Sequence, residues 1–271
     1  MKIAICYYGS LGGLTFKDNL GGIIPPDKCF QIFKEKIVKS NPECEFDFFL
    51  HSWSTSHEKE ILDTIKPIEY ILELQKNFWK EATSSSKSFF DSKDIRATLS
   101  TFLRKFFWKS SYNKLLRNRI LYKFSIYSRW YSTKKVVELK RLHEVKNNFK
   151  YDYVFLTRFD IFWHNIFKFK DLKNNYFYSS NWSVPNFFSF IKKNYDNRNF
   201  QDYWFAANSQ MIDIFATLYD YLPNYFPCSH RATYQHAKKM FGRENLSYIL
   251  HIIKDYELYR RVKKTEINFD E

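Results

Sequence analysis

The sequence has few cysteines and no long apolar run, and each shortage argues against a class of protein. The four cysteines contain no CxxC pair and follow no signal-peptide core, which argues against a zinc site and a disulfide framework. No stretch reaches the roughly 18 uncharged apolar residues of a membrane-spanning helix, and the apolar run at residues 1–9 is only as long as a strand. We therefore expect a cytoplasmic protein with reduced thiols.

Acidic residues are absent from one long segment. The net charge is +14, and residues 95–137 hold 11 Lys or Arg and no Asp or Glu. Aromatic side chains are interleaved with the basic ones, a pattern that suits peripheral contact with an anionic membrane or stacking on nucleic acid. An anionic substrate is a third possible partner. The alternative is an aromatic stripe facing the core beneath a solvated basic face.

Glycine is also scarce, and five of the six glycines lie between positions 9 and 22. They follow an apolar first strand at residues 2–8. A glycine-rich turn in that position lets backbone N–H groups approach phosphate closely. The spacing matches neither a Walker loop nor a GxGxxG fingerprint, so an ordinary surface loop explains the glycines equally well.

Hydrophobic periodicity predicts an α/β fold in one domain, residues 1–271. Strands at 2–8, 46–50 and 68–74 alternate with helices at 27–40 and 57–65, which is half of a nucleotide-binding sheet. We expect a loop at 77–92, a helical basic insertion at about 77–135, a helix at 128–149 and a central strand at 153–156. The second half, 164–271, is expected to hold strands near 176–178 and 203–207, a loop at 183–199 and helices at 209–221 and 232–240. Ser209 is the expected N-cap of the first of these helices.

Charged side chains follow the buried strands at the points where those strands end. Arg158 and Asp160 follow the central strand, His51 follows residues 46–50, and Asp202 opens another apolar segment. Ligands of open α/β sheets bind at the carboxyl ends of the strands, and buried charges are costly without partners. The sequence therefore predicts a site here, with a structural Arg158–Asp160 pair as the alternative for that motif.

With Asp160 and Asp202 in place, the chain resembles bacterial glycosyltransferases of capsule and lipopolysaccharide biosynthesis that have a GT-A type fold. The likeness spans roughly residues 1–259. It is carried by the first strand and its glycine loop and by the segments 47–53, 127–135, 151–160 and 202–208. The resemblance implies a mixed, mainly parallel sheet in which residues 1–163 bind a nucleotide sugar and residues 164–271 bind the acceptor.

The resemblance also implies roles for single residues. In the family a DxD motif ends the strand of the donor domain, and its last Asp holds a divalent cation on the diphosphate. Asp160 matches that Asp, while Arg158 replaces the first one, so Mn²⁺ or Mg²⁺ is the implied cofactor and Arg158 can neutralise diphosphate charge itself. The late acidic position, which binds the acceptor or acts as general base, matches Asp202. His230 is the implied second metal ligand, with His236 and His251 as competitors.

The implied donor is a nucleotide sugar, most simply a UDP-sugar, and the implied acceptor is a glycan or lipid-linked glycan at the inner face of the cytoplasmic membrane. The implied donor-binding residues are Tyr8, Gly9, Ser10, His51, Ser128, Lys135, Arg158 and Asp160. Lys135 would assist Arg158 at the diphosphate.

Three other functions stay open on the sequence. Another transferase with a diphosphate donor, such as one that moves a phosphoryl or phosphoramidate group, also has to bind diphosphate. A scaffold without catalysis is compatible with Arg158 at the DxD position. A nucleic-acid-binding protein would explain the charge, but the sequence has no helix-turn-helix, zinc-finger or RNP signature. We therefore do not expect nucleic acid as a partner.

Overall fold

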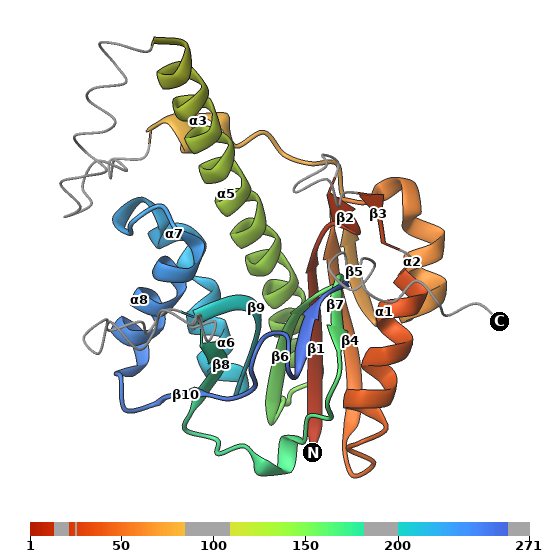
Figure 1. Ribbon diagram of the computed structural model, residues 1–271. Coiled ribbons are helices and arrows are strands. Elements are labelled where there is room, and N and C mark those ends of the chain that lie inside the picture. The colour runs from red at the N-terminus through yellow and green to blue at the C-terminus, as the bar shows by residue number, and fades with distance from the viewer. Residues whose placement is uncertain (14–21, 25, 85–108, 182–199, 260–271) are drawn as a thin grey trace.

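The computed structural model describes residues 1–13, 22–24, 26–84, 109–181 and 200–259, and its centre is a seven-stranded sheet with the order β10-β8-β9-β6-β1-β4-β5 (Figure 1). The strands of this sheet are β1 (Lys2–Gly9), β4 (Glu45–Ser52), β5 (Glu69–Leu72), β6 (Tyr153–Arg158), β8 (Phe177–Asn181), β9 (Phe200–Ala207) and β10 (Leu246–Tyr248). Two small sheets pair β2 (Gly12–Gly13) with β3 (Gly22–Ile23) and β7 (Ile161–Trp163) with β11 (Tyr256–Leu258).

The main helices are α1 (Pro26–Phe33), α2 (Glu58–Ile65), α3 (Trp79–Ser84), α5 (Lys109–Lys146), α6 (Ser209–Ala216), α7 (Leu218–Tyr221) and α8 (Ser229–Phe241). The α1 helix continues as a π-helical segment, η2 (Lys34–Val38), where the sequence predicted one helix to residue 40. Short 3-10 turns, η3 (Thr55–His57), η5 (Phe169–Asp171) and η7 (Leu222–Asn224), connect other elements.

The sheet is mixed and mainly parallel, as the sequence predicted. Strand β1 pairs in parallel with β4 on one side and with β6 on the other, and β4 pairs in parallel with β5. Strand β9 runs antiparallel to both β6 and β8. Both predicted halves of the chain therefore contribute strands to one sheet.

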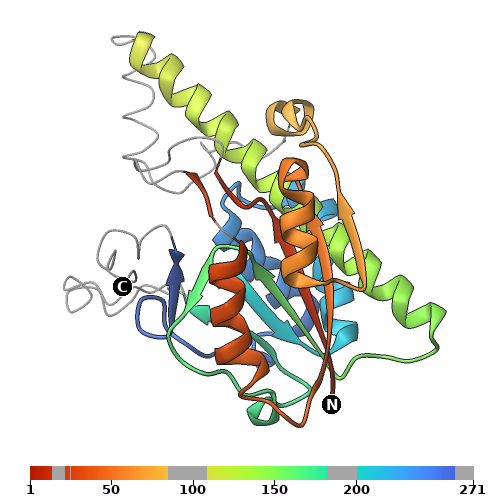
Figure 2. The ribbon, with the colours of Figure 1, turned by 90° about the vertical axis from the view of Figure 1, so that its right-hand side faces the viewer.

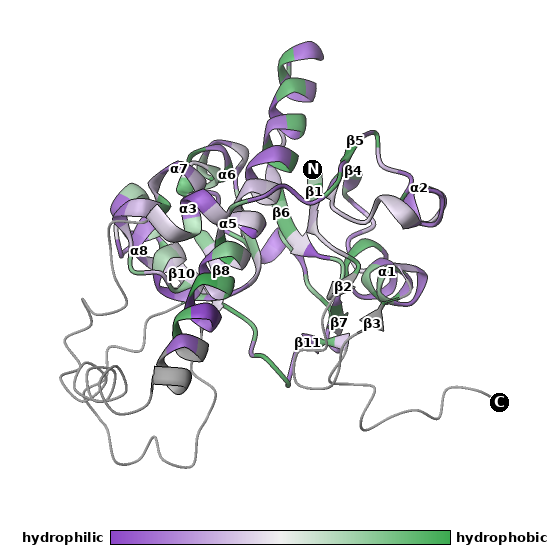
Figure 3. Cartoon of the chain, turned by 90° about the horizontal axis from the view of Figure 1, so that it is seen from above, coloured by the Kyte–Doolittle hydropathy of each residue, from purple (hydrophilic) through white to green (hydrophobic). Residues whose placement is uncertain are grey.

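Alternate residues of β1 supply two hydrophobic layers. Ala4, Cys6 and Tyr8 pack beneath α5, α6 and α8. Ile3, Ile5 and Tyr7 pack beneath α1, η2 and α2 on the opposite face. Figure 3 shows the two groups of helices on the two sides of the sheet. Burial on both faces explains why these strands are continuous apolar runs in the sequence.

The α5 helix differs most from the prediction. A helical basic insertion at about 77–135 was expected, continuing as a helix over 128–149. The structure has one helix of 38 residues from Lys109 to Lys146. Its later turns pack on the sheet, and its amino-terminal end projects beyond the sheet (Figures 1 and 2). Part of the predicted loop at 77–92 is the helix α3, and residues 85–108 lie outside the described part.

Two helix starts were also predicted wrongly. The N-cap of α6 is Asn208, whose side chain accepts a hydrogen bond from the Met211 N–H at 2.9 Å. Ser209, the predicted cap, instead turns its hydroxyl into a buried polar cluster. The α8 helix begins at Ser229, three residues earlier than predicted. The loop predicted at 183–199 lies outside the described residues.

No helix within the described residues is both long enough and apolar enough to cross a bilayer.

The cluster around Ser209 joins α5 to α6. The Lys140 ammonium is fully buried and lies 3.1 Å from Glu144 Oε2, 2.6 Å from Asp213 Oδ1 and 2.6 Å from Ser209 Oγ. Glu144 Oε1 accepts the Tyr151 N–H at 3.0 Å. The cluster therefore also fixes the point where the chain leaves α5 and enters β6.

Replacing Lys140 is expected to destabilise the fold. Lys140→Met leaves two acidic side chains without their buried partner, so we expect the free energy of unfolding to fall by about 3–5 kcal/mol. The matched control is Lys134→Met, which breaks the exposed pair between Lys134 and Asp220 and should cost less than about 1 kcal/mol. Urea denaturation measures both changes, and equal losses would refute a structural role for the cluster.

Candidate functional site

The candidate site lies where the order of the strands reverses. The chain builds β4 and β5 on one side of β1 and then returns through α5 to place β6 on the other side. In open α/β sheets a crevice forms at the carboxyl ends of the strands at such a point. Here those ends are formed by β1 and β6, the two strands that the sequence placed beside the predicted site.

Three predicted donor-binding residues form one row at this edge. Tyr8 of β1 is the register partner of His51 on β4 and of Arg158 on β6. Residues that are register partners on neighbouring strands share a face of the sheet. The row lies on the face of the sheet that α5 covers, because Tyr8 packs beneath that helix. Gly9 and Ser10 follow directly on β1.

An irregularity in β9 presents Asp202 to the same edge. Tyr178 of β8 pairs with Ala206, but Ser180 pairs with Gln201, so a step of two residues on β8 spans five residues on β9. The extra residues form a bulge, a feature that re-aims side chains. Because β9 is antiparallel to β6, its amino-terminal end lies beside the carboxyl end of β6.

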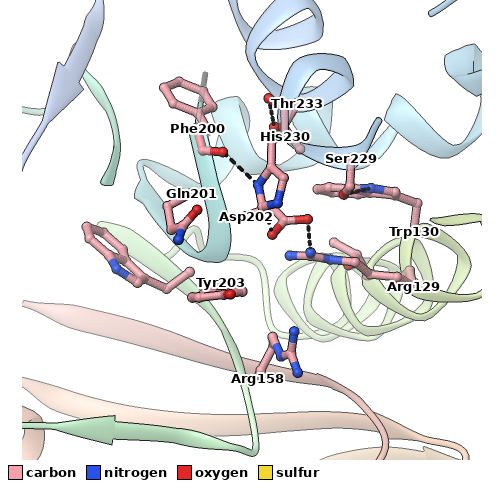
Figure 4. A network of polar contacts seen from close by, with 12 residues as sticks. Arg129, Trp130, Arg158, Phe200, Gln201, Asp202, Tyr203, Ser229, His230 and Thr233 are labelled. Carbon is pink, nitrogen blue, oxygen red and sulfur yellow. Dashed lines mark hydrogen bonds and ion pairs between the residues drawn. The ribbon is translucent and has the colours of Figure 1, made fainter. Parts of the chain in front are cut away.

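Asp202 is almost fully buried and has cationic and polar partners on α5 and α8 (Figure 4). One carboxylate oxygen forms an ion pair with Arg129 of α5, and the other lies 3.2 Å from Nδ1 of His230, the second residue of α8. Arg129 also donates to the Tyr8 hydroxyl at 2.8 Å. Burial alone would raise the pKa of Asp202, but the charges of Arg129, His230 and Arg158 and a hydrogen bond from Ser229 together outweigh it, so the pKa lies below its ordinary value.

His230 has a defined tautomer. Its Nδ1 lies 3.0 Å from the Phe200 carbonyl oxygen as well as 3.2 Å from Asp202, and both of these atoms are acceptors. Nδ1 therefore carries the proton, and in the neutral ring the lone pair is on Nε2. Burial lowers the pKa of His230 despite the neighbouring carboxylate, which favours that neutral ring.

Arg158 and Asp160 form the pair that the sequence offered as an alternative to a ligand site. Arg158 Nε and Nη2 donate to the two oxygens of Asp160 at 2.7 and 2.5 Å. The guanidinium also lies over the ring of Tyr203, 5.3 Å from its centroid. Tyr203 in turn accepts the Tyr8 hydroxyl through its carbonyl oxygen at 3.2 Å, which connects this pair to the Asp202 group.

His51 faces inward. The ring is fully buried, with Nε2 3.1 Å from Glu73 and Nδ1 2.8 Å from the Ser132 hydroxyl. The same hydroxyl accepts the Gly9 N–H at 2.8 Å. Burial lowers the pKa of His51. These bonds fix the end of β1 against α5, so the Gly9 N–H that was predicted to meet phosphate already has a partner.

The side chains of Ser128 and Lys135 have partners outside the Arg158 and Asp202 groups. Ser128 donates to Gln75 at 3.1 Å, and Lys135 pairs with Glu138 at 2.8 Å. Within the described residues, no hydrogen bond or ion pair joins either side chain to Arg158 or Asp202, and their predicted roles at the donor stay predictions.

Sequence reasoning missed Arg129, Ser132 and Tyr203. Arg129 and Ser132 lie inside the segment 127–135 that carries the resemblance, and their spacing of three residues places them on the same face of a helix. That spacing was the available signal, but it became useful only once the helix face toward the sheet was known.

The residues as arranged do not fit a protein-held divalent cation. Both oxygens of Asp160 are bound by Arg158, and the two oxygens of Asp202 are engaged by Arg129 and His230. Across the described ranges, no three His, Cys, Asp or Glu side chains gather in a way that could hold a metal. Metal binding by Asp160 and His230 stays a prediction.

Neither a protein-family model nor a curated protein sequence matches the chain.

The buried Asp202 should make stability depend on acid pH. Its folded-state pKa lies below its unfolded value of about 4, so its contribution is complete above that pH and is lost as the pH falls through the folded pKa. We expect Asp202→Asn to lower the free energy of unfolding at pH 7 and to flatten its decline below about pH 4. Urea denaturation from pH 7 to pH 3 measures this difference.

The exposed Asp220 supplies the control, because Asp220→Asn should leave the pH profile of stability close to that of the wild type. A profile for Asp202→Asn that runs parallel to the wild type throughout would contradict the lowered pKa.

Proposed function

We propose that the chain is a glycosyltransferase that moves a sugar from a nucleotide-sugar donor to a growing capsule or lipopolysaccharide acceptor, and that its fold is of the GT-A type. The observation that carries the proposal is the convergence of Arg158, Arg129, Asp202 and His230 at the point where the strand order reverses. The mixed, mainly parallel sheet is consistent with it, since the resemblance implied such a sheet.

The charges of the site support this chemistry. During glycosyl transfer a nucleoside diphosphate leaves with a negative charge, which the protein has to stabilise. Arg158 ends β6 as the register partner of Tyr8, and its guanidinium lies over the ring of Tyr203. A diphosphate in the crevice would meet this charge at the place where open α/β sheets bind nucleotides.

The Asp202–His230 pair supports a role at the acceptor. In a reaction that inverts configuration, a base removes the proton of the attacking hydroxyl. The sequence assigned that role to Asp202, but both of its oxygens are engaged and its pKa is lowered. We propose His230 as the alternative base, because Asp202 contacts its Nδ1 and holds the ring in the tautomer whose lone pair is on Nε2.

The release of nucleoside diphosphate tests this proposal. We expect the purified protein to hydrolyse one nucleotide sugar slowly from a panel of UDP-, GDP- and CDP-linked sugars, with a UDP-sugar as the expected donor. With acceptor present, Asp202→Asn should lower the transfer rate by about 10²-fold or more, as the loss of acid–base catalysis does. Asp220→Asn, on the surface, should not.

The proposal would be wrong if no nucleotide sugar in the panel is hydrolysed and no donor or nucleoside diphosphate raises the thermal midpoint of the protein. A scaffold without catalysis would then be the better explanation. Transfer of a phosphoryl group from the same donors would establish a different transferase.

We also propose that the basic amino-terminal part of α5 contacts an anionic cytoplasmic membrane surface, where lipid-linked acceptors are held. This end of the helix projects from the body of the protein, and residues 109–137 hold eight basic residues and no acidic one (Figure 2).

Reversing two charges there should weaken membrane binding. We expect Lys114→Glu with Arg117→Glu to lower cosedimentation with phosphatidylglycerol vesicles several-fold while leaving turnover of a soluble acceptor unchanged. Lys28→Glu with Lys59→Glu reverses the same number of charges on α1 and α2 and should have little effect. Equal losses for the two variants would show that only net charge matters.

A further inference from the structure

The two arginines of the site are more accessible than the carboxylates that pair with them. The Arg158 side chain is 27% exposed and its partner Asp160 is 4% exposed. Arg129 is 15% exposed and its partner Asp202 is 5% exposed. A ligand that approaches this edge of the sheet therefore reaches the guanidinium groups first, with the carboxylates behind them. This order suits an anion and not a cation.

Each guanidinium keeps donors for a ligand. A guanidinium has five N–H groups. Within the described residues, Arg158 uses Nε and Nη2 on Asp160, and Arg129 uses Nη1 on Asp202 and Nη2 on the Tyr8 hydroxyl, so two groups are engaged on each side chain and three remain. The Nε of Arg129 is buried without a hydrogen-bond partner in the described structure. Phosphate oxygens match this planar arrangement of donors.

Two further features favour an anion at this place. The α8 helix has 13 residues, and its first two, Ser229 and His230, lie beside Asp202, so the positive end of its dipole is directed into the site. Gly9 has a φ of +105°, and a Cβ placed on it would meet no atom of the described residues within 4 Å.

A divalent cation would find the opposite environment. Coordination by Asp160 would require one of its oxygens to leave Arg158, and the cation would then lie next to a guanidinium. Like charges at such a short distance repel strongly where water is largely excluded. Coordination by Asp202 meets the same obstacle in Arg129.

We propose that Arg129 and Arg158 bind the diphosphate of the donor directly and that the protein needs no divalent cation for this step. The inference rests on the proposed function. When the bond between the anomeric carbon and the diphosphate oxygen breaks, its electron pair stays on that oxygen, and guanidinium N–H groups meet the new charge. The acceptor oxygen forms the new bond to the anomeric carbon and gives its proton to the base.

Calorimetric titration of the wild-type protein with UDP, GDP, CDP and inorganic pyrophosphate in EDTA tests this site. We expect at least one nucleoside diphosphate, and more weakly pyrophosphate, to bind in EDTA, with an affinity that changes less than threefold when Mn²⁺ or Mg²⁺ replaces the chelator. Binding should weaken as salt increases, since exposed charges are screened.

The variants replace each ion pair as a unit, so that no buried charge is left alone. Arg158→Gln with Asp160→Asn is expected to weaken binding in EDTA at least tenfold, and Arg129→Gln with Asp202→Asn should act in the same direction. Arg141→Gln, which removes an exposed arginine from the same long helix, is the matched control and should bind like the wild type. Circular dichroism and the thermal midpoint establish that each variant is folded.

The outcomes separate the two proposals. Binding that appears only when Mn²⁺ or Mg²⁺ is added would overturn this inference and leave the glycosyltransferase proposal standing. Undiminished binding by the folded Arg158 and Asp160 double variant in EDTA would also overturn the inference. No binding with or without cations, together with no turnover of any nucleotide sugar, would overturn both.

Discussion

The guanidinium of Arg129 is the contact on which the arrangement of the site depends. It joins the middle of α5 to Tyr8 at the end of β1 and to Asp202 in the irregular part of β9. It also lies over the rings of Tyr8 and Trp130, 5.3 and 5.2 Å from their centroids. A buried carboxylate is costly without a cationic partner. The distorted end of β9 can therefore hold Asp202 inside the protein only because α5 brings Arg129 to the same point.

A second set of buried contacts fixes the part of α5 that follows Arg129. Ser132, one turn after Arg129, bridges Gly9 and His51, and Lys140 binds the acidic side chains of α5 and α6. The helix is thus attached to β1, β4 and α6 by buried polar bonds as well as by apolar packing. Such bonds specify one position of the helix, because a shift by one residue would leave several polar groups unsatisfied.

The sequence predicted the strands around β1 well, because each is a short apolar run buried on both faces and bounded by polar residues. It also placed His51, Arg158, Asp160 and Asp202 near strand ends, and the structure brings His51 and Arg158 into one row with Tyr8. It did not predict the bulge in β9, because a bulge depends on pairing with β8 and not on local residue types. It predicted helical structure through the basic block and over 128–149, but it did not place the start of α5 at Lys109. Partners far apart in the chain, such as Asp202 with Arg129, became visible only in the folded structure.

The continuity of α5 also fixes a length. Arg117, on the projecting part, precedes Arg129 by twelve residues, and at 1.5 Å per residue this corresponds to about 18 Å along the helix axis. A rigid helix keeps this separation constant. If the projecting end rests on a bilayer, the reacting hydroxyl of a lipid-linked acceptor has to lie at a height of as much as about 18 Å above the headgroups. The fixed length of the helix would then favour acceptors with glycans long enough to reach the site. Acceptors whose reacting sugar lies close to the lipid would be disfavoured.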